Sequence, residues 1–262
     1  MYAYKIEKGQ TVRVELSEET AELHISSGNS KIGKISNFST LPGDKNHCVV
    51  NAVLNAKTTD VPGTCTGYSS LCYGACYARN ALARYWGSCT VPWAENTLLL
   101  RSGRLWGLLD SWMAKHKPDE FRVNVSGEIE DAGQLGHWCE LAAKYPGTKF
   151  CVYTKNYAAL IAHAESGKGY PANMCVNISQ WHHCADGAIR KLRELGVSLN
   201  VFEYDDSNLK GNALPPEDIE RLKGMRHCPA VLESGKMDHS VQCKTCGYCY
   251  NNDGKETAVY SH

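Results

Sequence analysis

Seven of the thirteen cysteines of this chain fall into two tight groups, and clustered thiolates are soft ligands that suit zinc and iron–sulfur centres. The first group comprises Cys65, Cys72 and Cys76, and the second comprises Cys228, Cys243, Cys246 and Cys249. Four thiolates can close a tetrahedral zinc site or a cubane 4Fe–4S site, whereas three leave one coordination position open. We therefore expect structure or electron transfer from the second group and chemistry from the first.

The first group has the spacing C-x6-C-x3-C and lies where a loop runs into a helix predicted to begin near Cys76. The amide groups and dipole at a helix N-terminus lower the pKa of a thiol and favour the ligating thiolate. This arrangement favours a three-thiolate iron–sulfur site. A zinc site completed by Cys48 or His47, and simple burial of the thiols, are the alternatives.

The second group combines a Cys228-Pro229 pair with a C-x2-C-x2-C run. Both features occur in ferredoxin-like 4Fe–4S sites, while four cysteines with Gly247 in the turn also suit zinc. We expect a second 4Fe–4S cluster here, with zinc as the alternative.

The composition of the chain limits its partners and its location. In 262 residues, 28 Lys and Arg balance 28 Asp and Glu, so no net field draws the protein to nucleic acid or to anionic membranes. The N-terminus has no signal-peptide pattern, and no run of 18 apolar residues occurs. We expect a cytoplasmic protein with no membrane contact.

Regular strand-like and helical runs follow a loop-rich first part. Residues 1–27 predict a hairpin or edge strands, and residues 28–63 predict mostly loop with a short strand at 48–53. Apolar spacing predicts helices at 76–86 and 94–116. Strands are then expected at 121–126, 149–154, 174–179 and 197–204, with helices near 132–145, 157–165 and 186–195.

Alternating strands and helices at this interval predict successive βα units and a parallel sheet. We expect an α/β fold in which residues 1–213 form a partial or complete parallel βα barrel with an N-terminal β extension. Residues 214–262 are expected to form a C-terminal Cys-rich metal module, opened by a short helix that ends near Lys223.

Polar residues follow the predicted strands, at the edge of a parallel sheet where functional groups collect. The strand ends read Ser126-Gly127-Glu128, Thr154-Lys155-Asn156, Ser179 to His183, and Glu203 to Asp206. His182 and His183 with the acidic residues near 203–206 would suit a second metal or an acid–base site, or else a polar rim. Glu128 would anchor a ligand, or else be a solvated loop carboxylate.

Several stretches resemble the phage gene product 88 family over nearly the whole chain. They are GNSKIG at 28–33, NFSTLPGD at 37–44, CTGYSSLCYGACYA at 65–78, RVNVSGEIED at 122–131 and the CP…CKTCGYC tail. More distantly, the C-x6-C-x3-C-Y-A loop, followed by βα units with a strand that ends in Thr-Lys, resembles the radical S-adenosylmethionine (SAM) superfamily. Its spacing departs from the most common pattern there, C-x3-C-x2-C, at both intervals.

The second resemblance implies specific roles. In that superfamily three cysteines hold a 4Fe–4S cluster whose open iron binds SAM, and reduction cleaves SAM to a radical. Cys65, Cys72 and Cys76 would then ligate iron, and Tyr77 would occupy the aromatic position beside the third cysteine. Gly127 and Glu128 resemble the strand end that receives the SAM amino group. Thr154, Lys155 or Ser179 would meet the ribose or carboxylate by position.

We therefore expect a radical SAM-like enzyme that takes electrons from an external donor and acts on a small molecule or nucleotide, with a modified DNA base as one candidate. The substrate would enter at the strand ends that carry the expected catalytic residues Lys155, His182 and Glu203. One alternative is a non-catalytic iron–sulfur or zinc protein that binds nucleic acid or a protein partner. Another is metal-dependent hydrolysis at His182 and His183.

Overall fold

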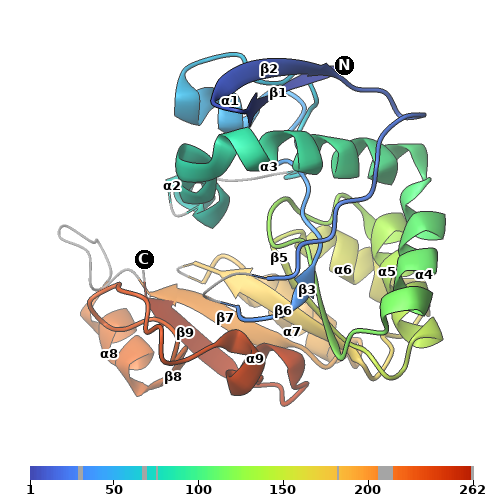
Figure 1. The fold of residues 1–262 in the computed structure, drawn as a ribbon. Coiled ribbons are helices and arrows are strands. Elements are labelled where there is room, and N and C mark those ends of the chain that lie inside the picture. The colour runs from blue at the N-terminus through green and yellow to red at the C-terminus, as the bar shows by residue number, and fades with distance from the viewer. Residues whose placement is uncertain (29–31, 67–69, 75, 182, 206–214, 261–262) are drawn as a thin grey trace.

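A computed structural model of the chain describes residues 1–28, 32–66, 70–74, 76–181, 183–205 and 215–260. Two sheets organise it (Figure 1). The smaller is an antiparallel hairpin of β1 (Tyr2–Glu7) and β2 (Gln10–Glu15), which confirms the predicted N-terminal β extension. The larger is a sheet of seven strands in the order β3-β4-β5-β6-β7-β9-β8, with every neighbouring pair parallel.

The strands of the large sheet are β3 (Ser36–Asn37), β4 (Glu120–Val123), β5 (Lys149–Thr154), β6 (Met174–Gln180), β7 (Asn200–Asp205), β8 (Arg226–His227) and β9 (Glu256–Tyr260). In β4, Phe121 and Val123 are fully buried in the main core, whereas Arg122 points to the other face. The same alternation continues in β5, where Phe150 and Val152 enter the core.

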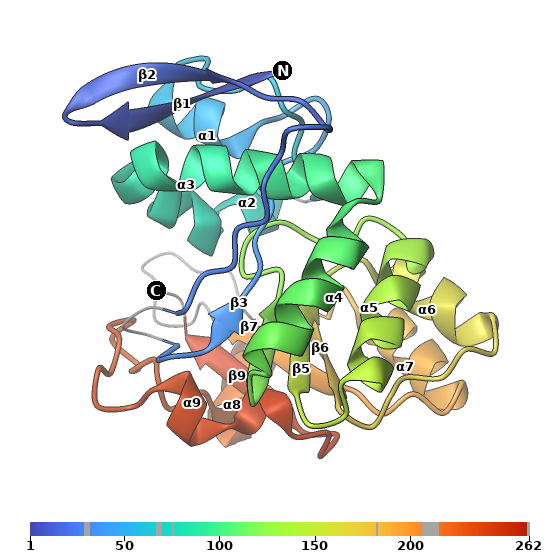
Figure 2. The ribbon, with the colours of Figure 1, turned by 45° about the vertical axis from the view of Figure 1, so that its right-hand side comes forward.

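Four helices follow the chain order of the sheet: α4 (Leu105–His116), α5 (Ala132–Lys144), α6 (Tyr157–Glu165) and α7 (Asp186–Glu194). They lie together on one face of the sheet (Figure 2). The buried side chains of α5, such as Leu135 and Trp138, join those of the strands in one hydrophobic core. The βα alternation predicted from the sequence is therefore confirmed, and the opposite face of the sheet is left for other segments.

The N-terminal hairpin rests on the long helix α3 (Tyr77–Ser102), above the sheet (Figures 1 and 2). The approach is close because Gly87 lies under Ile6, and a Cβ atom at Gly87 would come within 2.4 Å of the Ile6 side chain. Beside them lies α1 (Val49–Leu54). The prediction of a short strand at 48–53 is therefore wrong. In VVNAVL the apolar residues at 49, 50, 53 and 54 share one helical face against the core, and Asn55 ends the helix with a positive φ.

The helices predicted at 76–86 and 94–116 are divided differently in the structure. Helix α3 continues from Tyr77 through Pro92 to Ser102, with a kink at Tyr85, and Gly103 ends it with a φ of 75°. A separate helix, α4, then begins at Leu105. The break lies at the glycine because a left-handed C-cap costs glycine little.

The C-terminal segment contains α8 (Pro216–Gly224), the short α9 (Cys243–Cys246) and a 3-10 turn at Tyr248–Tyr250. It also supplies β8 and β9, and β9 lies between β7 and β8. Residues expected to form a separate metal module thus contribute two strands to the main sheet. The sheet has two edge strands, β3 and β8, which are not paired with each other in the strand order. The structure therefore shows a parallel α/β sheet and does not confirm a barrel. In the described ranges, none of the helices is long and apolar enough to cross a membrane.

Candidate functional site

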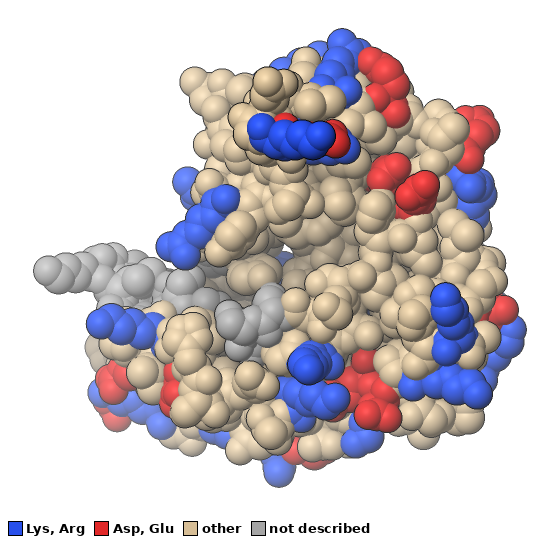
Figure 3. All heavy atoms as spheres, viewed as in Figure 1, with Lys and Arg blue, Asp and Glu red and all other residues tan. Residues whose placement is uncertain are grey.

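A cavity of about 290 Å³ lies between the free face of the sheet and the segments that cover it. Side chains from both cysteine groups line it: Cys65, Cys72, Cys76, Cys228, Cys243 and Cys249. The space-filling view shows a hollow between the upper layer of α3 and the hairpin and the lower layer of the sheet, with mostly uncharged residues around it (Figure 3). Cysteines more than 150 residues apart in sequence therefore face one chamber.

The first cysteine group enters the cavity from α2 (Ser70–Gly74), from the N-cap of α3, and from the loop before α2. Cys76 is the N-cap of α3, as the sequence predicted. Burial, and then the negative charge of Glu128, raise the pKa of Cys65 to about 12. Burial also raises the pKa of Cys72. In the metal-free chain these thiols keep their protons at neutral pH, and a bound metal would have to displace them.

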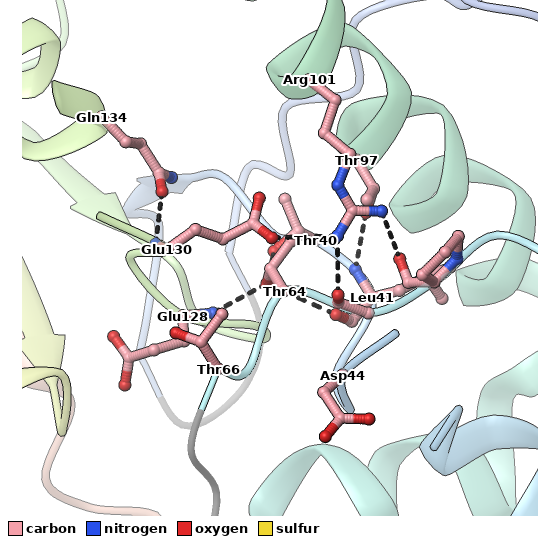
Figure 4. A network of polar contacts seen from close by, with 12 residues as sticks. Thr40, Leu41, Asp44, Thr64, Thr66, Thr97, Arg101, Glu128, Glu130 and Gln134 are labelled. Atoms are coloured by element: carbon pink, nitrogen blue, oxygen red, sulfur yellow. Dashed lines mark hydrogen bonds and ion pairs between the residues drawn. The ribbon is translucent and has the colours of Figure 1, made fainter. Parts of the chain in front are cut away.

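Gly127 and Glu128 lie against the loop that leads to Cys65 (Figure 4). The Glu128 backbone N–H donates to Thr64 Oγ1 at 2.9 Å, and the Thr64 and Thr40 hydroxyls are 2.8 Å apart. Gly127 has a φ of 83°, and a Cβ atom there would lie 1.9 Å from Thr40 Oγ1. Only glycine fits this backbone without displacing its neighbours.

The Glu128 side chain is buried and turns back onto the chain. Its Oε1 accepts a hydrogen bond from the Ile129 N–H and its Oε2 accepts one from the Lys155 N–H, each at 2.8 Å. Burial raises the pKa of Glu128, although the Lys155 charge works against this rise. Burial disfavours the Lys155 ammonium, yet its electrostatic interactions with Cys72 and Glu128 outweigh that effect and raise the pKa of Lys155. The expectation of a solvated Glu128 is therefore wrong, because both carboxylate oxygens have backbone donors.

Arg101 of α3 fixes the loop before the first cysteine (Figure 4). Its guanidinium donates to the carbonyl oxygens of Pro62 and Gly63 at 3.0 and 2.8 Å, and it pairs with Glu130 at 2.9 Å. One side chain thus joins α3, the cysteine loop and the segment after β4. The sequence analysis did not single out this role.

The second cysteine group is fastened to the free face of the sheet. The Tyr153 hydroxyl donates to Cys249 Sγ at 2.6 Å, and the Asn177 and Asn200 amides donate to the carbonyl oxygens of Cys249 and Asn251 at 3.1 and 2.9 Å. Burial raises the pKa of Cys249 to about 12. Cys246 is not among the residues that line the cavity. Three cysteines of this group, like three of the first, therefore face the chamber.

The remaining wall of the cavity is aromatic and polar. Tyr153 and Phe202 meet edge to face at 4.9 Å, and the Trp181 ring has the Lys155 ammonium 5.0 Å from its centre. Other cavity residues are Tyr77, Ser179, Tyr204, Arg122, Asn124 and Ser126. Arg122 and Asn124 were not predicted as site residues, whereas Ser126 was expected at the functional edge of the sheet as part of a strand end. The signal for all three is the alternation of polar and apolar residues in FRVNVS.

The predicted site residues divide between this cavity and other places. Tyr77, Gly127, Glu128, Lys155 and Ser179 line the cavity together with six of the seven cysteines. Thr154 is buried, accepts a hydrogen bond from the Asn156 N–H, and does not line the cavity. Glu203 is buried in an ion pair with Arg221 at 2.6 Å and accepts a hydrogen bond from Gln180. His182 lies outside the described residues.

His183 lines a different, shallow pocket, where it contacts Asp186 at 3.0 Å and Asp218 at 2.8 Å. Cys48 and His47, the alternative zinc ligands for the first group, do not line the cavity either.

The donor set of the cavity suits soft metals, since thiols predominate among its ligating groups. Within the described ranges, no three His, Cys, Asp or Glu side chains lie close enough together to hold one metal ion. A multinuclear cluster spreads its thiolates more widely than a single ion does. The thiols around the cavity are of the ligand type that iron–sulfur clusters use, but no three of the described side chains are arranged to hold a single metal ion.

The fold and the cavity define an α/β protein with a parallel sheet whose free face and covering loops enclose a thiol-lined chamber. The gene product 88 family matches residues 23–252, and the chain belongs to this family. No curated protein and no solved structure matches the chain.

Proposed function

We propose that this chain is an iron–sulfur enzyme of the radical SAM type, with Cys65, Cys72 and Cys76 as ligands of a 4Fe–4S cluster. The observation that supports this most is that the three thiols share a cavity with the Gly127-Glu128 strand end. When bound, the cluster supplies one electron, received from an external donor, to SAM. The cluster would lie at the three thiols, and SAM and then a small-molecule or nucleotide substrate would reach it through the cavity.

The residues around the cavity have separate tasks in this proposal. Glu128 receives the SAM amino group, and Tyr77 flanks the third cysteine. Lys155 and Ser179 contact the ribose or carboxylate of SAM or the substrate, while Thr154 supports them from behind the wall. The aromatic side chains Trp181 and Phe202 keep water away from the reacting atoms.

The position of the cavity also supports a partial barrel. Helices α4 to α7 cover one face of the sheet, and the cavity lies on the other, at the side that would face inward in a barrel (Figure 2). Glu203 and His182 remain candidate catalytic residues of this strand-end edge. Reduced, clustered thiols suit a cytoplasmic protein.

The second cysteine group would hold a second metal centre through Cys228, Cys243 and Cys249, with Cys246 as the fourth ligand. A 4Fe–4S cluster and zinc are the two candidates. Because three of these thiols face the same chamber as the first group, a redox-active centre there would lie on the electron path to the cavity.

A second candidate function is a non-catalytic metalloprotein in which both centres are structural. It is favoured by the spread of the first cysteine group over three segments, since a metal there would tie the Cys65 loop to α2 and to the N-terminus of α3. Such a protein would bind nucleic acid or a protein partner. The face in Figure 3 carries Lys, Arg, Asp and Glu side by side, which is less suited to nucleic acid than a basic face.

The experiment is a metal and activity assay on protein purified and reconstituted without oxygen. Iron, sulfide and zinc are measured for wild type, for Cys65/Cys72/Cys76→Ala, and for Cys48/Cys89/Cys184→Ala. The control variant also loses three cysteines, and none of them lines the cavity. Each protein is then mixed with SAM and dithionite, and 5′-deoxyadenosine is measured.

We expect about eight irons in wild type and in the control and about four in the first variant, with 5′-deoxyadenosine absent only from the first variant. Zinc without iron in the first group would contradict the proposal and favour the structural metalloprotein. If the protein binds iron but does not cleave SAM, the cluster assignment stands and the radical SAM activity is excluded.

A further inference from the structure

Three polar side chains at the end of β4 line the cavity and have atoms without a partner. Among the described residues, Arg122 Nε, both polar atoms of the Asn124 amide, and Ser126 Oγ are buried and make no hydrogen bond. Asn124 and Ser126 are 4% and 3% exposed. Buried polar groups nearly always have partners, and leaving one unpaired costs about 1–3 kcal/mol. Four such atoms in one wall of the cavity mark a place where a polar ligand can bind.

The charge in this wall is positive. The Arg122 guanidinium lies 4.9 Å from the centre of the Tyr153 ring, and in the described part of the chain no carboxylate pairs with it. An arginine in a cavity without an acidic partner is a natural site for a carboxylate or a phosphate, which it binds through parallel N–H groups.

The amide beside it is suited to a second kind of contact. Asn124 follows Arg122 by two residues and has a φ of 50°, which turns the chain at the end of the strand. A free amide presents one donor and one acceptor side by side, as required by the edge of a nucleobase or of another amide. A single small ligand can reach both side chains, since both line the same chamber of about 290 Å³.

We propose that Arg122, Asn124 and Ser126 form the recognition wall for a small ligand that carries a carboxylate or phosphate, with Arg122 binding this acidic group and Asn124 the ligand's donor–acceptor edge. This inference rests on the proposed function in placing the ligand beside the first cysteine group. SAM, through its carboxylate, and a nucleoside monophosphate substrate are the two sources of this chemistry.

The test compares ligands that differ only in the acidic group, by calorimetry on anaerobically reconstituted protein. One pair is SAM and decarboxylated SAM, and the others are the nucleoside 5′-monophosphates and their nucleosides. We expect at least one member with the carboxylate or phosphate to bind about tenfold or more tightly than its partner without it. The pair that shows the difference identifies the source of the acidic group.

Arg122→Met should remove that difference, whereas Arg84→Met, which removes the same charge from an exposed position on α3, should retain it. Asn124→Gly keeps the left-handed backbone and deletes the side-chain amide. It should therefore lower the affinity for both ligands of a pair by the same factor. Arg122→Met should also unfold at the same temperature as wild type or a higher one, because an unpaired buried charge disfavours the fold.

Two results would overturn the proposal. If no ligand with a carboxylate or phosphate binds more tightly to wild type than its partner without that group, the wall does not recognise acidic groups. If Arg122→Met unfolds at a lower temperature or loses iron or zinc, Arg122 stabilises Tyr153 and the nearby Cys249 instead. Neither result would contradict the proposed function, which is tested by cluster content and SAM cleavage.

Discussion

The backbone N–H of Glu128 donates a 2.9 Å hydrogen bond to the Oγ1 atom of Thr64. Thr64 directly precedes Cys65, and Glu128 is the residue that we expect to receive the SAM amino group. The bond therefore fixes the distance between a candidate cluster ligand and a candidate SAM ligand, although 63 residues separate them in the chain.

Thr64→Val keeps the shape of the side chain and removes the acceptor. The buried Glu128 N–H then has no partner, and the Thr40 hydroxyl loses its contact. We expect a loss of about 1–3 kcal/mol in the free energy of unfolding, measured by urea denaturation. Thr66→Val, an exposed position in the same loop, should change it by less than about 0.5 kcal/mol. Equal effects in the two variants would contradict the role of Thr64.

Gly127→Ala tests the close contact beneath the strand end. The new methyl group would lie 1.9 Å from Thr40 Oγ1 and 2.6 Å from Thr64 Oγ1, at a φ of 83°. Gly167→Ala is a matched control, because Gly167 has a φ of 75° and nothing within 4 Å of its Cβ position. The control should lose about 1 kcal/mol of stability through backbone strain alone, and Gly127→Ala should lose at least about 2 kcal/mol more. A similar loss of stability in both variants, measured by thermal unfolding, would show that Thr40 and Thr64 move aside to accommodate the new methyl group.

Arg221→Met leaves the carboxylate of Glu203 buried without its charged partner. Glu203 is 2% exposed and the Arg221 side chain 33%, so we expect a loss of about 2–3 kcal/mol, less than for a fully buried pair. Adding Glu203→Gln to the Arg221→Met variant should restore at least half of the lost unfolding free energy, because no unpaired buried charge remains. Lys223→Met on the same helix, which breaks an exposed pair with Glu220, is the control. If Glu203 is also catalytic, the double variant folds but does not act on substrate.

His183 should make stability depend on pH. A hydrogen bond to Asp218, and the charge of Asp186, raise the pKa of His183 above its usual value of about 6.5. A raised pKa in the folded state means that the charged histidine stabilises the fold. This contribution is complete below pH 6.5 and is lost as pH rises through the folded pKa.

The stability difference between wild type and His183→Asn should therefore be larger at pH 5.5 than at pH 9, as measured by urea denaturation. Asparagine is chosen because it tolerates the positive φ of this position. Asp218→Asn should reduce the same pH dependence. A difference that does not change with pH would contradict the ion pair.

The βα part of the fold is predictable from the sequence because strand and helix patterns alternate there without conflict. The strand at 149–154 and the helix at 157–165 have the predicted bounds. The run VVNAVL could not be assigned in this way, because a short apolar stretch suits a strand or a buried helix equally well. The strand β9 was missed, since ETAVY is too short to indicate that it enters the sheet between β7 and β8.

The cysteines and the Gly-Glu strand end were identifiable because their residue types are rare in such spacing. Their common cavity was not, because it depends on how the C-terminal segment crosses the sheet. The contact of Tyr153 with Cys249 joins residues 96 positions apart, and local patterns contain no information about it. Glu203 was predicted at the site from its strand end alone, whereas its geometry is determined by Arg221, on a helix that follows later in the chain.

The position of β9 has a consequence for the biosynthesis of the protein. During translation, β3 to β7 emerge from the ribosome before β9, and β8 has β9 as its partner in the sheet. The segment with the second cysteine group connects β8 to β9, so the cavity is completed after residue 260 has been synthesised. Until then the cavity lacks the wall that Cys228, Cys243 and Cys249 supply, so the first three cysteines become enclosed only in the last stage of synthesis.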